Sequence, residues 1–238
     1  MELSDREVLR YLGYRADEAD GRIIALVKEL IAVFAESAAP KSVYGIWDCR
    51  VDALTVALDT GCAAGGMTVN SEELATHLAG CRRLVLLAAT LGPEADTLIR
   101  RYSVKDMGKA VVAQAVCTAM IEAYCDTIEG EIMQSDELQG LYATARYSPG
   151  YGDFDITHQK DIINLLNCGR RIGLTLTDGY MLAPSKSVTA VIGFSPEKKK
   201  ASVKCEHCST GLCEFKERHL QNSSFASATA ENCMFRSL

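Results

Sequence analysis

Apolar residues recur at helical spacing in several stretches of the chain. Between residues 17 and 38 they lie three or four positions apart, and Pro40 ends the pattern, so an amphipathic helix is predicted there. The longest helix is predicted from about Asp106 to Gln134. Because no charged residue stands between Lys109 and Glu122, most of that span must be buried.

Other stretches carry the pattern of β-strands. Residues 84–89 form a continuous apolar run that is typical of a buried strand, and 43–58 also has a β-like pattern. Apolar residues alternate over 174–182, and a second β segment follows at 187–194, so these two predict a hairpin or a paired set of strands. Helices grouped around several strands that do not alternate with them predict an α+β fold with a mostly antiparallel sheet.

The character of the chain changes near residue 195. A charged linker that contains Lys198–Lys200 follows the last predicted strand, and the sequence then becomes rich in cysteine, serine and alanine. We therefore expect one α+β domain over 1–197, and a linker with a cysteine-rich tail over 198–238. At 238 residues the chain is long enough to bury a large core.

The composition argues against two classes of partner. With 48% hydrophobic and 24% charged residues the chain is typical of a globular protein, and its net charge of −6 gives no sign of nucleic-acid binding. No apolar run approaches the roughly 18 residues of a membrane span, and the charged start of the chain lacks the apolar core of a signal peptide. We expect a cytoplasmic protein that binds neither nucleic acid nor membrane.

The segment 146–151, Arg-Tyr-Ser-Pro-Gly-Tyr, combines a fixed cation, a rigid turn and two aromatic rings. The planar guanidinium of Arg146 matches a carboxylate bidentately. Pro149 and Gly150 favour a tight turn, and Gly150 lets a ligand lie directly against the backbone. The segment is either a loop that holds a small molecule with an acid group or an ordinary surface turn with a solvated arginine.

Glu122 ends the uncharged span of the longest predicted helix. It lies on the same helical face as the small residues Ala115 and Ala119, and Asp126 lies one turn further along. An unpaired buried carboxylate is costly. Glu122 therefore either marks where the helix emerges into water or accepts hydrogen bonds from a ligand amine or from Arg146.

Three cysteines gather near the end of the chain. Cys205, Cys208 and Cys213 have C-x2-C-x4-C spacing, and the first pair suits a metal chelate. The candidates for a fourth ligand are His207, His219 and Cys233. Zinc would give a closed structural site, whereas an iron–sulfur cluster could carry electrons. The alternative is a group of reduced thiols.

The segment 146–151 and its surroundings resemble a known family. Arg-Tyr-Ser-Pro-Gly-Tyr is similar to the Arg-x-x-Pro-Gly-Tyr signature of the activation domain of cobalamin-dependent methionine synthase. The resemblance extends over roughly 110–195, and it includes the segments 176–184 and 187–190. The stretch 8–14 resembles small free-standing versions of the domain. The resemblance implies the α+β fold of that domain, in its free-standing form.

The resemblance also implies a function. In that family the domain presents S-adenosylmethionine to an oxidised cobalamin while a flavodoxin-type donor supplies one electron, and the methyl group is restored. By resemblance, Arg146 would bind the carboxylate of S-adenosylmethionine, and Glu122 would contact the same ligand. Gly150 and Tyr151 would form a backbone and ring wall, with Tyr180 as a further wall. No catalytic acid or base is implied, because the task is to position the methyl group.

Three hypotheses for the function follow. The first is a reactivation subunit that binds S-adenosylmethionine and acts in trans on a cobalamin-containing methionine synthase, as a component of that methyltransferase. The second is a reductive activator of another corrinoid protein, with a C-terminal metal or iron–sulfur site that delivers the electron. The third is a module that binds a corrinoid protein and has lost the ligand site. In its favour, Gly140 stands six residues before Arg146, where the family has a second acid.

Overall fold

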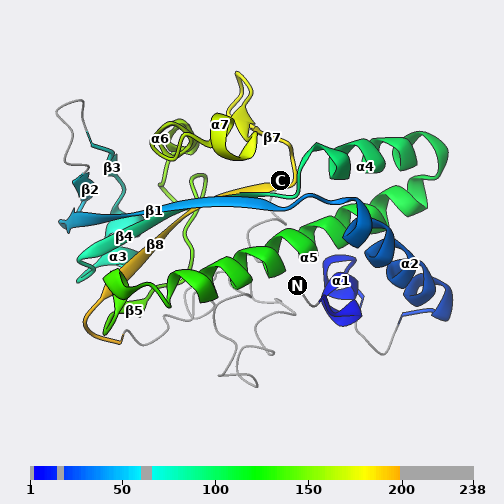
Figure 1. Ribbon diagram of the computed structural model, residues 1–238, viewed down its shortest axis with the longest axis horizontal. Coiled ribbons are helices and arrows are strands. Elements are labelled where there is room, and N and C mark those ends of the chain that lie inside the picture. Colours follow the sequence, from blue (N-terminus) through cyan, green and yellow to red (C-terminus); the bar gives the residue numbers. More distant parts are fainter. Residues whose placement is uncertain (1–2, 15–18, 60–65, 199–238) are drawn as a thin grey trace.

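A six-stranded antiparallel sheet forms the centre of the protein (Figure 1). The computed structural model describes residues 3–14, 19–59 and 66–198. The sheet order is β3-β2-β1-β4-β8-β5, and each pair of neighbours is antiparallel. The strands are β1 (Lys41–Val51), β2 (Thr55–Asp59), β3 (Thr68–Asn70), β4 (Arg83–Thr90), β5 (Tyr142–Ala143) and β8 (Ser187–Ser195). The predicted α+β fold with a mostly antiparallel sheet is confirmed.

The central strand β4 is buried on both faces, as its apolar run predicts. Leu84, Leu86 and Ala88 belong to the hydrophobic cluster on one face of the sheet, whereas Val85 and Leu87 belong to the cluster on the other. Successive side chains of a strand point to opposite faces, so a strand that is covered on both sides is apolar at successive positions. Because β4 pairs with β1 and with β8, both of its edges are also hydrogen-bonded.

Helices cover both faces of the sheet. The helices of one face are α3 (Glu72–Leu78), α6 (Gln159–Leu165) and α7 (Cys168–Ile172). The other face is covered by α5 (Met107–Ile132), whose Ile128 and Ile132 share a cluster with Val85 and Leu87. A third cluster packs α5 with α1 (Asp5–Tyr11), α2 (Gly21–Ser37) and α4 (Pro93–Lys105). Short 3-10 helices occupy Asp136–Leu138 and Ile156–His158. Figure 1 shows α5 along one side of the sheet and α6 and α7 on the opposite side.

The longest helix, α5, has 26 residues and begins where the Asp106 side chain accepts a hydrogen bond from the backbone N–H of Lys109. Most side chains between Lys109 and Glu122 are buried, as predicted. By length and hydropathy α5 could cross a membrane, a test that core helices of globular proteins also pass, and 56% of its apolar window is buried inside the structure. α5 is therefore packed as a core helix. It continues past the uncharged span, which ends at Glu122, and finishes at Ile132.

The chain after α7 differs from the sequence prediction in its pairing. The segments 174–182 and 187–194 do not pair with each other. The first contains a small separate hairpin of β6 (Thr175–Leu176) and β7 (Leu182–Ala183), whereas β8 pairs with β4 and β5 in the main sheet. The physical reason is burial. β8 is buried from Thr189 onwards, and only a position between two other strands of a covered sheet provides that burial.

Two glycines give opposite expectations for the same substitution. A Cβ on Gly193 in β8 would lie 2.6 Å from both Cys81 Sγ and Leu78 Cδ2, so Gly193→Ala should destabilise the fold by about 1–3 kcal/mol through overpacking. A Cβ on Gly130 in α5 would meet nothing within 4 Å, so Gly130→Ala should stabilise by about 0.5–1 kcal/mol. Urea unfolding of the two variants measures both changes. Equal effects of the two substitutions would contradict the packing described for β8.

Candidate functional site

The segment 146–151 begins as an extension of the main sheet. Tyr147 forms a bridge to Val191 of β8, with Tyr147 N–H to Val191 O at 2.9 Å and Val191 N–H to Tyr147 O at 2.8 Å. Successive side chains of an extended segment point to opposite faces. Arg146 therefore points toward α5, and Tyr147 points toward α3 on the other side of the sheet.

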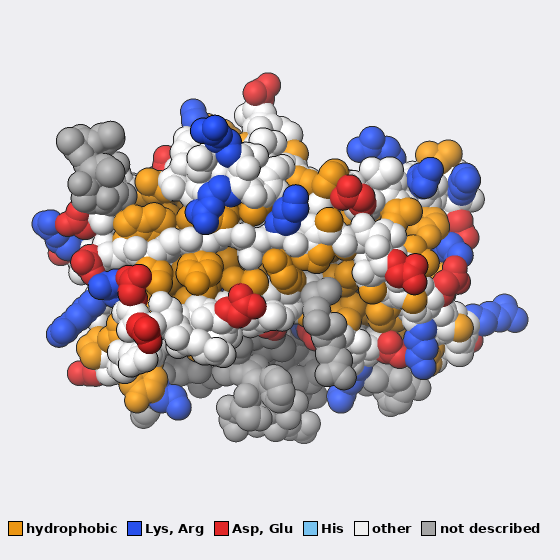
Figure 2. Space-filling view, viewed as in Figure 1, with side chains coloured by type: hydrophobic (Ala, Val, Ile, Leu, Met, Phe, Trp, Pro, Cys, Tyr) orange, Lys and Arg blue, Asp and Glu red, His pale blue; other side chains and the backbone are white. Residues whose placement is uncertain are grey.

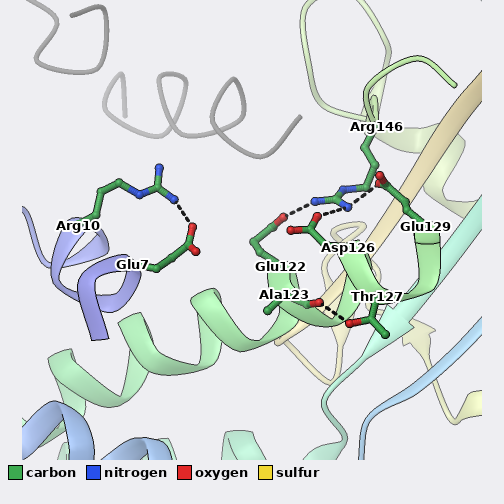
Figure 3. A network of polar contacts seen from close by, with 8 residues as sticks. All are labelled: Glu7, Arg10, Glu122, Ala123, Asp126, Thr127, Glu129 and Arg146. Atoms are coloured by element: carbon green, nitrogen blue, oxygen red, sulfur yellow. Dashed lines mark hydrogen bonds and ion pairs between the residues drawn. The ribbon is translucent and has the colours of Figure 1, made fainter. Parts of the chain in front are cut away.

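Arg146 binds three carboxylates of α5 (Figure 3). Its Nη2 atom lies 2.9 Å from Glu122 Oε2, and its Nη1 atom lies 2.9 Å from Asp126 Oδ1 and 2.5 Å from Glu129 Oε1. The three acids occur at helical spacing, so one face of α5 presents all of them. Only 3% of the Arg146 side chain is exposed. We call these four residues the Arg146 cluster.

The Arg146 cluster carries more negative than positive charge. Three carboxylates surround one guanidinium, which is a formal excess of two negative charges when all are ionised. Burial raises the pKa of Glu129, and the neighbouring carboxylates of Asp126 and Glu122 add to this, while Arg146 opposes it. The side chains of Asp126 and Glu122 are 45% and 21% exposed, so the cluster faces solvent at these two acids. This arrangement suits a ligand that carries a positive charge.

The Pro-Gly turn is confirmed. Tyr151 N–H donates to Ser148 O at 3.2 Å across the turn, and Gly150 at its third position has φ +96°, which favours glycine. Gly150 N–H also donates to Phe154 O at 2.7 Å. A Cβ on Gly150 would lie 3.1 Å from Ile156 Cδ1. The backbone conformation therefore favours glycine, and an added Cβ would also press against the end of the Ile156 side chain.

The other side of the loop is attached to α3. Tyr147 is 1% exposed and its hydroxyl donates to Glu73 Oε2 at 3.1 Å; burial raises the pKa of Tyr147. The carboxylate of Asp153 accepts hydrogen bonds from the Ser71 hydroxyl and, at 2.7 Å, from Glu72 N–H. The Ser71 hydroxyl, followed by backbone N–H groups, holds the pKa of Asp153 below its usual value. The segment 146–153 is thus held by α5 on one side and α3 on the other.

The structure brings Glu122 and Arg146 together, whereas Tyr151 packs with Tyr147 in the cluster on the α3 side of the sheet and Tyr180 lies at a separate cavity. Glu122 contacts Arg146 directly, which is one of the alternatives that its position on the helix left open. Gly150 and Tyr151 follow in the same loop, and Tyr151 packs against Tyr147 with ring centroids 6.0 Å apart. Tyr180 lies elsewhere, where it lines a cavity beside α6 and α7. The roles assigned to these residues toward a ligand stay predictions.

Two members of the Arg146 cluster were not among the predicted site residues. Asp126 and Glu129 follow Glu122 at helical spacing, and this spacing is visible in the sequence. Their shared partner is not visible, because it depends on where the loop after β5 meets α5. Sequence patterns report the face of a helix but not what docks on it.

The predicted metal ligands Cys205, Cys208 and Cys213 lie outside the described residues. Over 3–14, 19–59 and 66–198, no group of three or more His, Cys, Asp and Glu side chains is arranged to hold a metal ion. The cysteines of this part, such as Cys117 and Cys125, are mostly buried, which agrees with the small apolar role of a structural cysteine. The metal site stays a prediction from the C-x2-C-x4-C spacing.

The raised pKa of Glu129 predicts a pH dependence of stability. The folded state binds this proton more tightly than the unfolded chain. The contribution of Glu129 to stability should therefore fall as the pH rises from its ordinary pKa of 4.5 through the raised value. Glu129→Gln lacks this titrating group and so lacks this loss of stability. The melting temperature of the wild type should therefore fall relative to that of the variant as the pH rises. Thermal unfolding from about pH 4 to about pH 8 measures it. Glu137→Gln, at an exposed ion pair, is the matched control, and a pH-independent difference would contradict the expectation.

Comparisons with known proteins agree with this architecture. Residues 75–208, more than half of the chain, match the family described as "Vitamin B12 dependent methionine synthase, activation domain". That range contains the whole of α5 and the segment 146–151. A comparison with curated proteins found no match.

A solved structure has the same fold. It is described as the MetH reactivation domain bound to AdoHcy, and it matches with a TM-score of 0.60 and 13% identity, over 93% of this chain and 78% of that chain. At this identity the likeness shows the fold alone. The family match covers the helix and the loop that form the Arg146 cluster, and the chain belongs to the family of vitamin B12 dependent methionine synthase activation domains.

Proposed function

We propose that this protein binds S-adenosylmethionine and serves the reductive remethylation of the cobalamin of a methionine synthase. The observation that carries the proposal is the Arg146 cluster, which lies within the part of the chain that matches the activation-domain family. The similar solved structure is described as bound to AdoHcy, which is the product of methyl transfer from S-adenosylmethionine. A flavodoxin-type protein is the proposed electron donor.

The charges of the cluster support a ligand of this type. S-adenosylmethionine carries an ammonium, a sulfonium and a carboxylate, so its net charge is positive at neutral pH. The excess negative charge around Arg146 attracts such a ligand and repels a purely anionic one. In this proposal Glu122 accepts hydrogen bonds from the ammonium, and Arg146 binds the carboxylate.

The geometry specifies what the ligand has to displace. Both Nη atoms of Arg146 already donate to carboxylates. Asp126 is the most exposed of the three acids, at 45% of its side chain. In this proposal the ligand carboxylate replaces Asp126 on Nη1, and Glu129 keeps the guanidinium in place from the buried side. The chain supplies position and charge, the ligand supplies the methyl group, and the cobalamin of the partner receives it.

Calorimetry with S-adenosylmethionine tests binding. Arg146→Lys keeps the positive charge but loses the planar fork, so affinity should fall about tenfold or more. Glu122→Gln removes one negative charge and should also weaken binding. Arg83→Lys is the matched control, because Arg83 also pairs with more than one carboxylate, those of Asp48 and Glu137, and has no place in the proposed site.

The control should bind as tightly as the wild type. Absence of binding by the wild type, or equal affinity of wild type and Arg146→Lys, would contradict the assignment of Arg146. Circular dichroism of each variant separates loss of binding from loss of folding.

Reactivation in trans tests the role. A methionine synthase fragment that holds oxidised cobalamin and lacks an activation domain should regain activity when this protein, S-adenosylmethionine and a reducing flavodoxin are added together. Omission of S-adenosylmethionine should abolish the effect. Co-purification with the cobalamin protein but reactivation that does not depend on S-adenosylmethionine would favour the third hypothesis, a binding module without a ligand.

A further inference from the structure

A second candidate site lies on the opposite face of the sheet from the Arg146 cluster. A cavity of about 650 Å³ is formed between α6, α7 and the β6–β7 hairpin. Its volume falls in the range of about 300–1,000 Å³ that is usual for small-molecule sites. We call it the α6–α7 cavity. None of the residues of the Arg146 cluster lines it.

The charged residues of the α6–α7 cavity are mainly cationic. Lys160 and Arg170 line it together with one acid, Asp178. Within the described part of the chain, neither Lys160 nor Arg170 takes part in an ion pair. Figure 2 shows Lys and Arg side chains gathered over α6 and α7. In a chain with a net charge of −6, this local balance of two cations to one acid favours an anionic ligand.

Uncharged residues complete the lining. Asn164 and Asn167 provide amide groups that both donate and accept hydrogen bonds. Leu174 is fully buried and lies at the cavity together with Leu176. A wall with cations, amides and apolar surface fits a ligand that has a charged end and a flat polar ring better than a bare inorganic ion.

The backbone is strained where it forms this lining. Asn167 and Tyr180 have φ values of +52° and +59°, and they are the non-glycine residues with positive φ in the described part of the chain. Asparagine tolerates this conformation, but it is unusual for tyrosine. Both residues line the α6–α7 cavity. Such strain gathers at ligand sites, where the surrounding structure holds it.

We propose that the α6–α7 cavity binds a phosphorylated nucleoside. Lys160 and Arg170 bind the phosphate, the amides of Asn164 and Asn167 bind polar edges of the base or sugar, and Tyr180 contacts the ring. Every contact in this assignment comes from the α6–α7 side of the sheet. The proposal is independent of the S-adenosylmethionine site around Arg146.

Titration calorimetry with AMP as the probe tests the proposal. The wild type should bind AMP with a Kd on the order of 0.1–1 mM, and more tightly than adenosine or inorganic phosphate alone. The double variant Lys160→Ala/Arg170→Ala should bind AMP at least about tenfold more weakly, because it loses the charge-assisted hydrogen bonds to phosphate. Both residues are exposed, so the double variant should fold normally.

Arg171→Ala is the matched control, because Arg171 is an exposed cation of α7 that does not line the cavity. It should bind AMP like the wild type. No binding of AMP, or an equal loss in Arg171→Ala, would overturn the proposal. Competition between AMP and S-adenosylmethionine would also overturn it, since the two would then share one site. Two sites are distinguished if Arg146→Lys loses S-adenosylmethionine binding and keeps AMP binding, while the double variant loses AMP binding and keeps S-adenosylmethionine binding.

Discussion

The two backbone hydrogen bonds between Tyr147 and Val191 determine how the candidate site is built. They extend the sheet by one more pairing beyond β5, and they place two consecutive side chains on opposite faces. Arg146 then reaches the carboxylates of α5, while Tyr147 enters the core beside α3. The loop that follows is therefore anchored on two sides before the Pro-Gly turn begins. A loop held in this way can present backbone groups to a ligand at a defined position.

In the Arg146 cluster a buried arginine has a structural role beside the ligand-binding role that we propose for it. A buried ion pair contributes little net stability, because desolvation offsets much of the attraction, but loss of one partner leaves an uncompensated charge. Here the more buried Glu129 and the more exposed Asp126 share the same Nη atom. The buried contact orients the guanidinium, and the exposed contact is the one that the proposed ligand would replace. The cluster is thus buried at Glu129 and open to solvent at Asp126.

Features that depend on local chemistry could be predicted from the sequence, and features that depend on docking could not. The buried strand at β4 follows from its uninterrupted apolar run, and the Pro149-Gly150 turn follows from the conformations of these two residues. The sequence leaves Glu122 as one possible partner of Arg146, but the pairing of Arg146 with Asp126 and Glu129 as well depends on the register between Tyr147 and Val191, and no local pattern encodes that register. The same reason explains the separation of Tyr180 from Arg146. Resemblance placed both residues at one ligand, but the hairpin that carries Tyr180 packs beside α6 and α7.

The position of β8 has a consequence for when the domain can fold. β8 is the last strand of the described chain, yet it lies inside the sheet and pairs with β4, where Arg83 lies opposite Phe194. The chain from α4 to β7 forms one long connection between the paired strands β4 and β8. Pairing of two strands across such a long connection is slow, because the chain loses conformational entropy before the strands gain their contacts. A nascent chain that ends before β8 has an incomplete core, so folding of this domain must follow synthesis of nearly all of it.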